Sequence, residues 1–218
     1  MSRRLAREII EAGLAMNAAG LNQGTSGNLS ARWRQRILIT PSGVPYDELT
    51  PAKIVSMAMD GSYRGALAPS SEWRFHRDIL ATRPEVGAVL HAHSPFATAL
   101  ACLGRSIPAF HYMVAVAGGA DIRCAGYATF GSEALSAAVV RALEGRRACL
   151  MANHGMIALG DTPTAALKLA IEVETLAAQY WRALQVGEPK LLPAAEMQRV
   201  VNKFKSYGRR PGGASARS

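Results

Sequence analysis

Two apolar runs that end in histidine constrain this chain most. The segment VGAVLHAH (residues 86–93) and the segment ACLMANHG (residues 148–155) are both predicted to be strands, the second a buried one. Side chains at positions i and i+2 of a strand point to the same face. His91 and His93 are therefore predicted to present two imidazoles to one point in space. That is a metal-ligand arrangement if a third ligand arrives from elsewhere.

The third ligand candidate is His154, at the end of the second apolar run. Gly155 follows it and lets the backbone turn sharply. Three imidazoles with one open position are what a catalytic divalent metal requires, and imidazole favours zinc among the first-row metals. The alternative is chance placement, because an HxH motif is a weak signal by itself. His76 and His111 are interpreted as ordinary core or surface residues.

Length and composition predict one domain. The chain has 218 residues, of which 49% are hydrophobic, enough for a single sizeable core. We expect this domain over residues 1–208 and a disordered tail over residues 209–218, which are rich in Gly, Arg, Ser and Ala. Glu8 and Glu11 make the first segment an amphipathic helix rather than a targeting segment. No apolar run reaches the ~20 residues that span a bilayer, so no membrane partner is expected.

Cysteine usage and charge narrow the setting. Cys102, Cys124 and Cys149 are far apart and include no CxxC, so neither a disulfide framework nor a thiolate zinc site is expected. A reducing, cytoplasmic location fits best. The formal net charge is +9, but no nucleic-acid motif accompanies it. We interpret the charge as a solvated basic surface that attracts anionic substrates, not as a nucleic-acid site.

Local patterns predict the order of helices and strands. Because strands and helices mix without a regular βαβ rhythm, we expect an α/β layered domain with the site at loop ends on one rim of a central sheet. Residues 107–131 are predicted to be loop and short strand. Ser94 is predicted to cap a helix that Pro95 opens. Other helices are predicted over residues 3–19, from near 70 onward, and over 132–144, 162–186 and 194–206, with further strands over 29–33, 36–40 and 53–61.

Three clusters of small residues have the chemistry of an anion site. They are TSGN (25–28), PSG (41–43) and PSS (69–71), and each offers hydroxyls or backbone N–H groups. The last lies at a helix N-terminus, which favours anions. Any one alone is an ordinary turn, but together they are able to hold one phosphate with neutral donors. None is a nucleotide-binding phosphate loop. Glu72, next to the last cluster, is either a routine helix-start charge or an acid/base near the metal.

A series of segments in order along the chain resembles the class II aldolase/adducin family and, within it, the L-fuculose-1-phosphate aldolases. The resemblance runs from Leu5 to Arg209 and implies a single-domain three-layer fold with a central, mostly antiparallel sheet flanked by helices. It departs from the family at Ala92 and Asn153, which leaves the preferred aldehyde open. The segments are LNQGTSGNLSAR, ITPSGVPYDELTP, PSSEWRFH, AVLHAHS, IPAFHYMVAVAGG, YATFG, NHGMIA and KFKSYG.

The resemblance implies a zinc-dependent aldolase. It would cleave a deoxy-ketose 1-phosphate to dihydroxyacetone phosphate and an aldehyde through a metal-stabilised enediolate. The candidate substrates are L-fuculose 1-phosphate, 5-deoxyribulose 1-phosphate and 5-(methylthio)ribulose 1-phosphate. One Zn²⁺ per subunit is implied, with Mn²⁺ or Co²⁺ as alternatives, in a homotetramer whose C-terminal segments approach the sites near a subunit boundary.

The resemblance also implies residue roles. The metal ligands are His91, His93 and His154, with Glu72 as a further ligand in the resting enzyme and as the acid/base once substrate displaces it. Tyr112 helps to protonate or orient the departing aldehyde oxygen. The remaining implied contacts are Asn28, Ser42, Gly43, Ser70 and Ser71 for the phosphate, Gly27 for the shape of its loop, and Phe130, Phe204 and Tyr207 for the aldehyde side.

Three other functions stay open. A 5-(methylthio)ribulose-1-phosphate dehydratase would share the metal and phosphate chemistry but remove water. An enzyme like ribulose-5-phosphate 4-epimerase would release no aldehyde. An adducin-like scaffold domain would keep the fold without a catalytic metal, and the presence of all three histidines with Glu72 argues against it.

Overall fold

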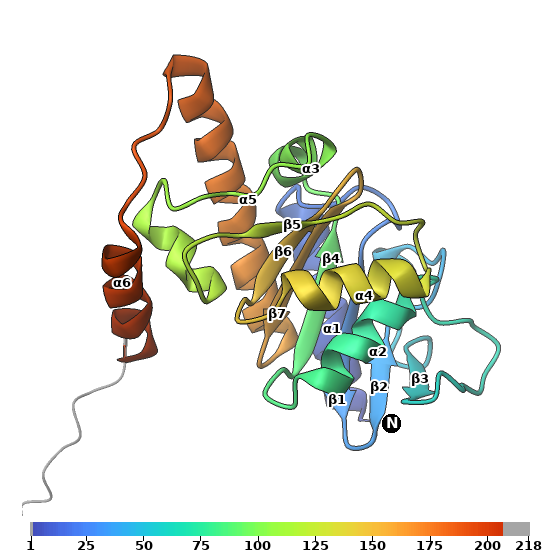
Figure 1. Cartoon of the computed structure of the whole chain (residues 1–218). Coiled ribbons are helices and arrows are strands. Elements are labelled where there is room, and N and C mark those ends of the chain that lie inside the picture. The colour runs from blue at the N-terminus through green and yellow to red at the C-terminus, as the bar shows by residue number, and fades with distance from the viewer. Residues whose placement is uncertain (1, 207–218) are drawn as a thin grey trace, which may run out of the picture.

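A seven-stranded sheet forms the middle of the molecule in the computed structural model, which describes residues 2–206 (Figure 1). The strand order is β3-β2-β1-β4-β7-β6-β5, and neighbours run antiparallel except for the parallel pair β5 and β6. The strands are β1 (Asn28–Trp33), β2 (Arg36–Ile39), β3 (Val55–Ala58), β4 (Ala88–Ala92), β5 (Arg123–Ala125), β6 (Ala148–Met151) and β7 (Gly155–Gly160).

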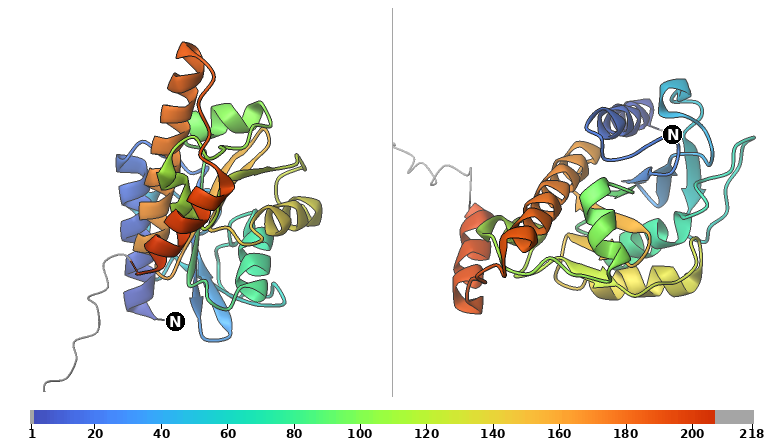
Figure 2. Two further views of the ribbon diagram at one scale, coloured as in Figure 1. Left: turned by 60° about the vertical axis from the view of Figure 1, so that its left-hand side comes forward. Right: turned by 90° about the horizontal axis from the view of Figure 1, so that it is seen from above.

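Helices cover both faces of this sheet (Figure 2). One apolar layer includes Leu29 and Leu90, and the other includes Val89 and Ile157, so alternate residues of each strand enter opposite layers. The expected three-layer domain with a mostly antiparallel sheet is confirmed. No helix within residues 2–206 is both long and apolar enough to cross a membrane. Helices α1 (Arg3–Ala18), α3 (Pro95–Cys102) and α5 (Pro163–Val186) lie on one face, α2 (Trp73–Thr82) and α4 (Glu133–Ala142) lie on the other, and α6 (Ala194–Ser206) packs on the 3₁₀ helix η2 (Tyr112–Ala117).

The N-terminus of α3 shows how a predicted cap can work differently. Ser94 is the N-cap and Pro95 opens the helix as expected, but the Ser94 hydroxyl makes no capping bond. It donates to a carboxylate oxygen of Glu174 on α5, 2.7 Å away. Glu174 also accepts the N–H groups of Phe96 and Ala97 at 2.8 and 2.9 Å. A carboxylate from a distant helix therefore caps α3 and fastens it to α5.

Two local expectations need correction. The strand predicted over residues 148–155 is shorter than expected, because β6 ends at Met151 and the chain turns before β7 begins at Gly155. Asn153 makes this turn with a left-handed backbone (φ +54°), a conformation that asparagine tolerates. Residues 107–131 contain η2 as well as the short strand β5. The predicted tail and Tyr207 lie outside the described residues.

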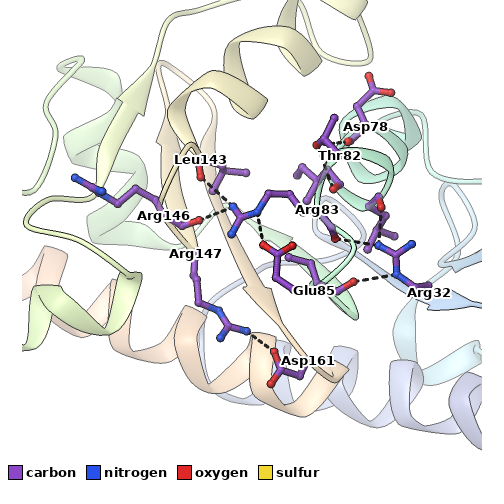
Figure 3. Close-up of polar contacts among 12 residues, drawn as sticks. Arg32, Asp78, Thr82, Arg83, Glu85, Leu143, Arg146, Arg147 and Asp161 are labelled. Carbon is purple, nitrogen blue, oxygen red and sulfur yellow. Dashed lines mark hydrogen bonds and ion pairs between the residues drawn. The ribbon is translucent and has the colours of Figure 1, made fainter. Parts of the chain in front are cut away.

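Strand β1 fixes α2 through its polar side chains. Its alternate residues Leu29 and Ala31 enter the apolar layer under α1, whereas Asn28, Ser30 and Arg32 face α2. The Arg32 guanidinium donates to three carbonyl oxygens where α2 ends, those of Leu80 (2.5 Å), Arg83 (3.0 Å) and Val86 (3.1 Å) (Figure 3). Carbonyls at a helix C-terminus lack helical partners, and a cation suits them.

Arg83 repeats this arrangement one helix further on. Its guanidinium donates to the carbonyls of Leu143 and Arg146, at 2.9 and 2.7 Å, just beyond the end of α4 (Figure 3). The two arginines thus connect β1, α2 and α4 in series on one face of the sheet. This face is the one that carries the candidate site.

Replacing Arg32 by Met should lower stability, because the apolar stem is kept while three carbonyls lose their charged donor. Hydrogen bonds to charged groups contribute about 1.5–3 kcal/mol, and we expect a loss in that range. Urea unfolding followed by circular dichroism measures it. Arg7→Met, which removes the same charge from an exposed position on α1, is the matched control and should change the free energy of unfolding by no more than ~0.5 kcal/mol. Equal effects of the two variants would contradict the role given to Arg32.

Candidate metal centre

Three imidazoles and one carboxylate converge at one rim of the sheet. The Nε2 atoms of His91 and His93 lie 3.0 Å apart. The two carboxylate oxygens of Glu72 lie 3.1 Å from His91 Nε2 and 3.2 Å from His154 Nε2. One ligand atom from each of the four residues lies within 4.8 Å of every other. The convergence predicted from the HxH motif and His154 is therefore present, and Glu72 belongs to it.

Strand pairing brings these side chains together. Asn28, the first residue of β1, pairs with His91 near the end of β4, because the two strands are antiparallel. His93 lies just beyond β4 and His154 lies in the turn between β6 and β7, not at a strand end as expected. A Cβ at Gly155 would lie 2.5 Å from the carbonyl oxygen of Ala92. Gly155 is thus required for close approach to the His93 segment, while the sharp turn falls on Asn153.

The chemistry of this donor set fits a cation. His91 Nδ1 lies 2.9 Å from the carbonyl oxygen of Met156, so Nδ1 carries a proton and Nε2 is the nitrogen that faces the cluster. Glu72 Oε1 is buried and has no hydrogen-bond partner among the described residues. Lone pairs at such distances repel one another unless a proton or a metal ion lies between them. The four residues are therefore able to hold a divalent metal.

Burial and mutual interaction set the charges of the cluster. Burial alone raises the pKa of the Glu72 carboxyl, but attraction to the adjacent His91 and His154 outweighs it and holds that pKa well below its ordinary value. Burial, followed by repulsion from His91 and His154, lowers the pKa of His93 to about 4. An ionised carboxylate and a neutral imidazole are the forms that bind metal.

A cavity of about 480 Å³ opens over the cluster. The PSG and PSS clusters lie side by side on its wall, because Pro41 and Pro69 form a β-bridge and Ser70 N–H donates to the Thr40 carbonyl at 3.0 Å. The structure thus places most of the expected substrate contacts around one space. Its lining residues are Thr25, Ser26, Gly27, Asn28, Pro41, Ser42, Gly43, Ser70, Ser71, Glu72, His93, Tyr127, Ala128, Phe130, Asn153 and His154.

Tyr112 and Phe204 are not among the residues that line this cavity. Their rings stack nearly parallel, 6.5 Å apart with 5° between their planes, where α6 packs on η2. They line a different hollow, of about 780 Å³, and the Tyr112 side chain is half exposed. Within a single chain the structure therefore does not bring either ring to the metal cluster. Tyr207, expected beside Phe204, falls among the residues that are not described.

Three contributors to the site escaped the sequence analysis. Tyr127 lines the cavity beside Phe130, and both side chains are about two-thirds exposed, at 67% and 66%. The motif YATFG contains both, and Phe130 was expected on the aldehyde side, but nothing local to the motif indicates that Tyr127 also lines the cavity. Asn153 also lines the cavity, and its position next to His154 was the available signal. His76 is a fully buried core residue, as interpreted, yet it hydrogen-bonds to Asn28 of the cavity wall.

Comparison with known proteins agrees with this geometry. Residues 7–181 match the family described as class II aldolase and adducin N-terminal domain. A 5-methylthioribulose-1-phosphate/5-deoxyribulose-1-phosphate aldolase from Rhodospirillum rubrum is 60% identical over 92% of this chain and 90% of its own length. An L-fuculose phosphate aldolase from Escherichia coli is 48% identical over 95% of this chain and 97% of its own. A solved L-fuculose 1-phosphate aldolase superimposes with a TM-score of 0.91 at 42% identity, covering 94% of this chain and 98% of that structure.

These matches extend over the strands, turns and loops that build the cluster and its cavity, from the first serine-rich loop to His154. The chain therefore belongs to the class II aldolase and adducin N-terminal domain family, and within it the chain is an aldolase, an enzyme of the lyase class.

Proposed function

We propose that the chain is a zinc-dependent aldolase that cleaves a deoxy-ketose 1-phosphate between carbons 3 and 4 into dihydroxyacetone phosphate and an aldehyde. The preferred substrates in this proposal are 5-deoxyribulose 1-phosphate and 5-(methylthio)ribulose 1-phosphate. The observation that carries it is the histidine and carboxylate cluster at the base of a cavity walled by three hydroxyl-rich turns. The high identity to an aldolase named for those two substrates supports the choice.

The hydroxyl-rich wall supports a phosphate subsite. Ser42, Gly43 and Ser71 line it, and the N-terminus of α2 lies directly behind Ser71. Backbone N–H groups, hydroxyls and the positive end of a helix dipole bind phosphate without a cationic side chain. Phosphate held there contributes binding energy remote from the reacting bond, which positions that bond over the cluster.

His91, His93 and His154 would hold the metal, with Glu72 as the fourth ligand. Three imidazoles favour zinc, with Mn²⁺ and Co²⁺ as alternatives. When bound, the cation supplies a Lewis acid for the negative charge that develops on the phosphate-bearing half of the substrate. The alternative of a Schiff-base lysine has no support within residues 2–206, because no lysine lines the cavity.

Glu72 is the acid/base in this proposal. Its carboxylate lies at the base of the cavity, and Asn28 Nδ2 donates to Oε2 at 3.1 Å. It carries the proton released by the carbon 4 hydroxyl, which becomes the aldehyde, to carbon 3, the atom left electron-rich when the bond between carbons 3 and 4 breaks. Tyr127, Ala128 and Phe130 form a largely apolar lip of the cavity, which suits an aldehyde that ends in a methyl or thioether group.

L-fuculose 1-phosphate is the second candidate substrate. Its aldehyde also ends in a methyl group but carries an additional hydroxyl, which needs a polar partner. Asn153 offers a side-chain amide at the cavity wall. The similarity to L-fuculose phosphate aldolases in sequence and fold supports this candidate as well.

We propose further that the site is completed by a neighbouring copy in a homotetramer. Tyr112 is half exposed and lies outside the cavity of its own chain, so it is available to orient the aldehyde oxygen in another subunit. Phe204 stacks on Tyr112 and would accompany it to the neighbouring site.

Free Cys102, Cys124 and Cys149 support a reducing, cytoplasmic setting.

A comparison of the three candidate ketose 1-phosphates tests the proposed reaction. Coupling to a dihydroxyacetone-phosphate reductase should detect release of that product, with the highest kcat/KM on the two 5-deoxy substrates. One hydroxyl without a partner costs about 1–3 kcal/mol, so we expect at least ~10-fold discrimination against L-fuculose 1-phosphate. Reversed preference would select the second candidate. Turnover without dihydroxyacetone phosphate would indicate a dehydratase or an epimerase and refute the aldolase.

Substitution of His93 by Ala should abolish both bound metal and cleavage. Loss of an outer-sphere partner lowers metal affinity about 10–100-fold, so loss of a ligand should cost at least as much. Inductively coupled plasma mass spectrometry of dialysed protein measures the amount of metal bound per chain. His111→Ala is the matched control, because His111 caps η2 outside the cluster, and it should retain the wild-type metal content. Full metal content in the His93 variant would exclude His93 as a ligand.

Subunit complementation tests the shared site. A Tyr112→Phe variant should form tetramers, as measured by light scattering, and should bind metal but cleave substrate poorly. The His93→Ala variant should lack metal but keep an intact Tyr112. Unfolding and refolding the two together should restore activity, because about a quarter of the sites then combine an intact cluster with an intact partner tyrosine in a cyclic tetramer. Mixtures no more active than the separate variants would show that Tyr112 acts in its own chain or not at all.

A further inference from the structure

A chain of buried hydrogen bonds runs from the sheet to the metal cluster between β1 and α2. Ser30 Oγ lies 2.8 Å from His76 Nδ1, and His76 Nε2 lies 2.5 Å from Asn28 Oδ1. Asn28 Nδ2 donates to Glu72 Oε2 at 3.1 Å. None of the four residues is more than 5% exposed. His76 is thus one step removed from Glu72 and has no place in the reaction proposed above.

The chemistry of the groups fixes the direction of every bond. The Asn28 amide nitrogen donates to the Glu72 carboxylate, so Nδ2 points toward Glu72 and Oδ1 points away from it. The Asn28 oxygen then faces His76, and since an amide oxygen has no proton, His76 Nε2 must donate. His76 Nδ1 is left as an acceptor for the Ser30 hydroxyl. The imidazole is neutral, as expected for a ring whose pKa burial lowers to about 3.

The reversed orientation of Asn28 would be costly. It would place the amide oxygen against the Glu72 carboxylate, so that two acceptors face each other. It would also place the amide nitrogen against the His76 N–H, so that two donors face each other. The observed orientation leaves the second N–H of Asn28 available to the cavity that Asn28 lines. Packing alone does not explain a histidine here, because an apolar side chain would fill the same space beside Phe75, which stacks on the ring at 4.7 Å.

We propose that His76 is a positioning residue: as the Nε2-protonated tautomer, held by Ser30, it locks the Asn28 amide so that its nitrogen faces both Glu72 and the substrate. This inference rests on the proposed aldolase function. His76 touches neither substrate nor metal and acts only through Asn28. Its removal should therefore misdirect the Glu72 carboxylate while leaving the cluster and the cavity in place.

Substitution of His76 tests the role by rescue. His76→Gln keeps an N–H donor toward Asn28, whereas His76→Leu does not. At saturating zinc, the Leu variant should have a kcat ~10–100-fold below that of wild type, with a smaller change in KM. The Gln variant should keep most of the wild-type kcat. Arg32→Met is the control for general loosening of the same β1–α2 contact and should keep the wild-type kcat. Equal kcat in the Leu variant and wild type, or equal losses in the Leu and Gln variants, would overturn the proposal.

Nuclear magnetic resonance of zinc-loaded protein labelled with ¹⁵N-histidine supplies a readout that needs no activity. His76 should show a protonated Nε2 and a bare Nδ1, and the signals are assigned by their loss in His76→Gln. His91 should show the opposite tautomer, since its Nδ1 faces the Met156 carbonyl, and serves as the internal standard. A His76 ring protonated at Nδ1 overturns the inference. If wild type cleaves none of the three substrates, the proposed function fails, and the tautomer still decides whether Asn28 is held as described.

Discussion

The register between β1 and β4 is the constraint on which the rest of the molecule depends. Because Asn28 pairs with His91, the first residue of one strand lies beside a candidate metal ligand near the end of the other. The same register directs Asn28, Ser30 and Arg32 toward α2. A shift by one residue would exchange these polar side chains with Leu29 and Ala31, which belong to the opposite apolar layer. The position of the site and the packing of the fold are therefore fixed by the same pairing.

Burying the polar groups of the site costs folding free energy, and the apolar layers on both faces of the sheet offset that cost. Three imidazoles and a carboxylate lie in contact, and repulsion between the rings is strong enough to help lower the pKa of His93 to about 4. Burial of such groups is favourable only where each finds a partner. The Met156 carbonyl satisfies His91, and Asn28 satisfies one oxygen of Glu72. The unpartnered Glu72 Oε1 is the part of this cost that a bound cation would remove.

Local sequence patterns predicted the elements and the cluster well, since each depends on short-range periodicity. The i, i+2 rule places His91 and His93 together, and helix limits such as those of α5 and α6 follow from turn residues and apolar spacing. Strand order and the parallel pairing of β5 with β6 depend on contacts between distant segments, and no local pattern encodes them. The turn at Asn153 was hidden because its apolar neighbours on both sides extend the strand pattern.

The limits of prediction around the cavity have the same physical origin. Tyr127 and Phe130 lie on a loop, where exposure depends on the neighbouring elements rather than on the residues themselves. The loop is held by α2, because Arg74 donates to the Gly131 carbonyl at 2.7 Å. The roles expected for Tyr112 and Phe204 stay predictions, because within a single chain neither ring lines the cavity.

This arrangement separates what all substrates share from what distinguishes them. In the proposed function, the hydroxyl-rich turns and the four-residue cluster lie next to the ends of β1, β2, β4 and α2 and in the β6–β7 turn. The pairing of β1 with β4 and the hydrogen bond from Asn28 to Glu72 connect two of these segments to the cluster. The aldehyde lip is built on the β5–α4 loop and, in the proposed tetramer, on a neighbour's Tyr112. Rigid elements hold a site more accurately than loops do. Under the proposed function, a change in this loop would alter the aldehyde preference, while the strand pairing that positions Asn28 beside His91 would stay the same.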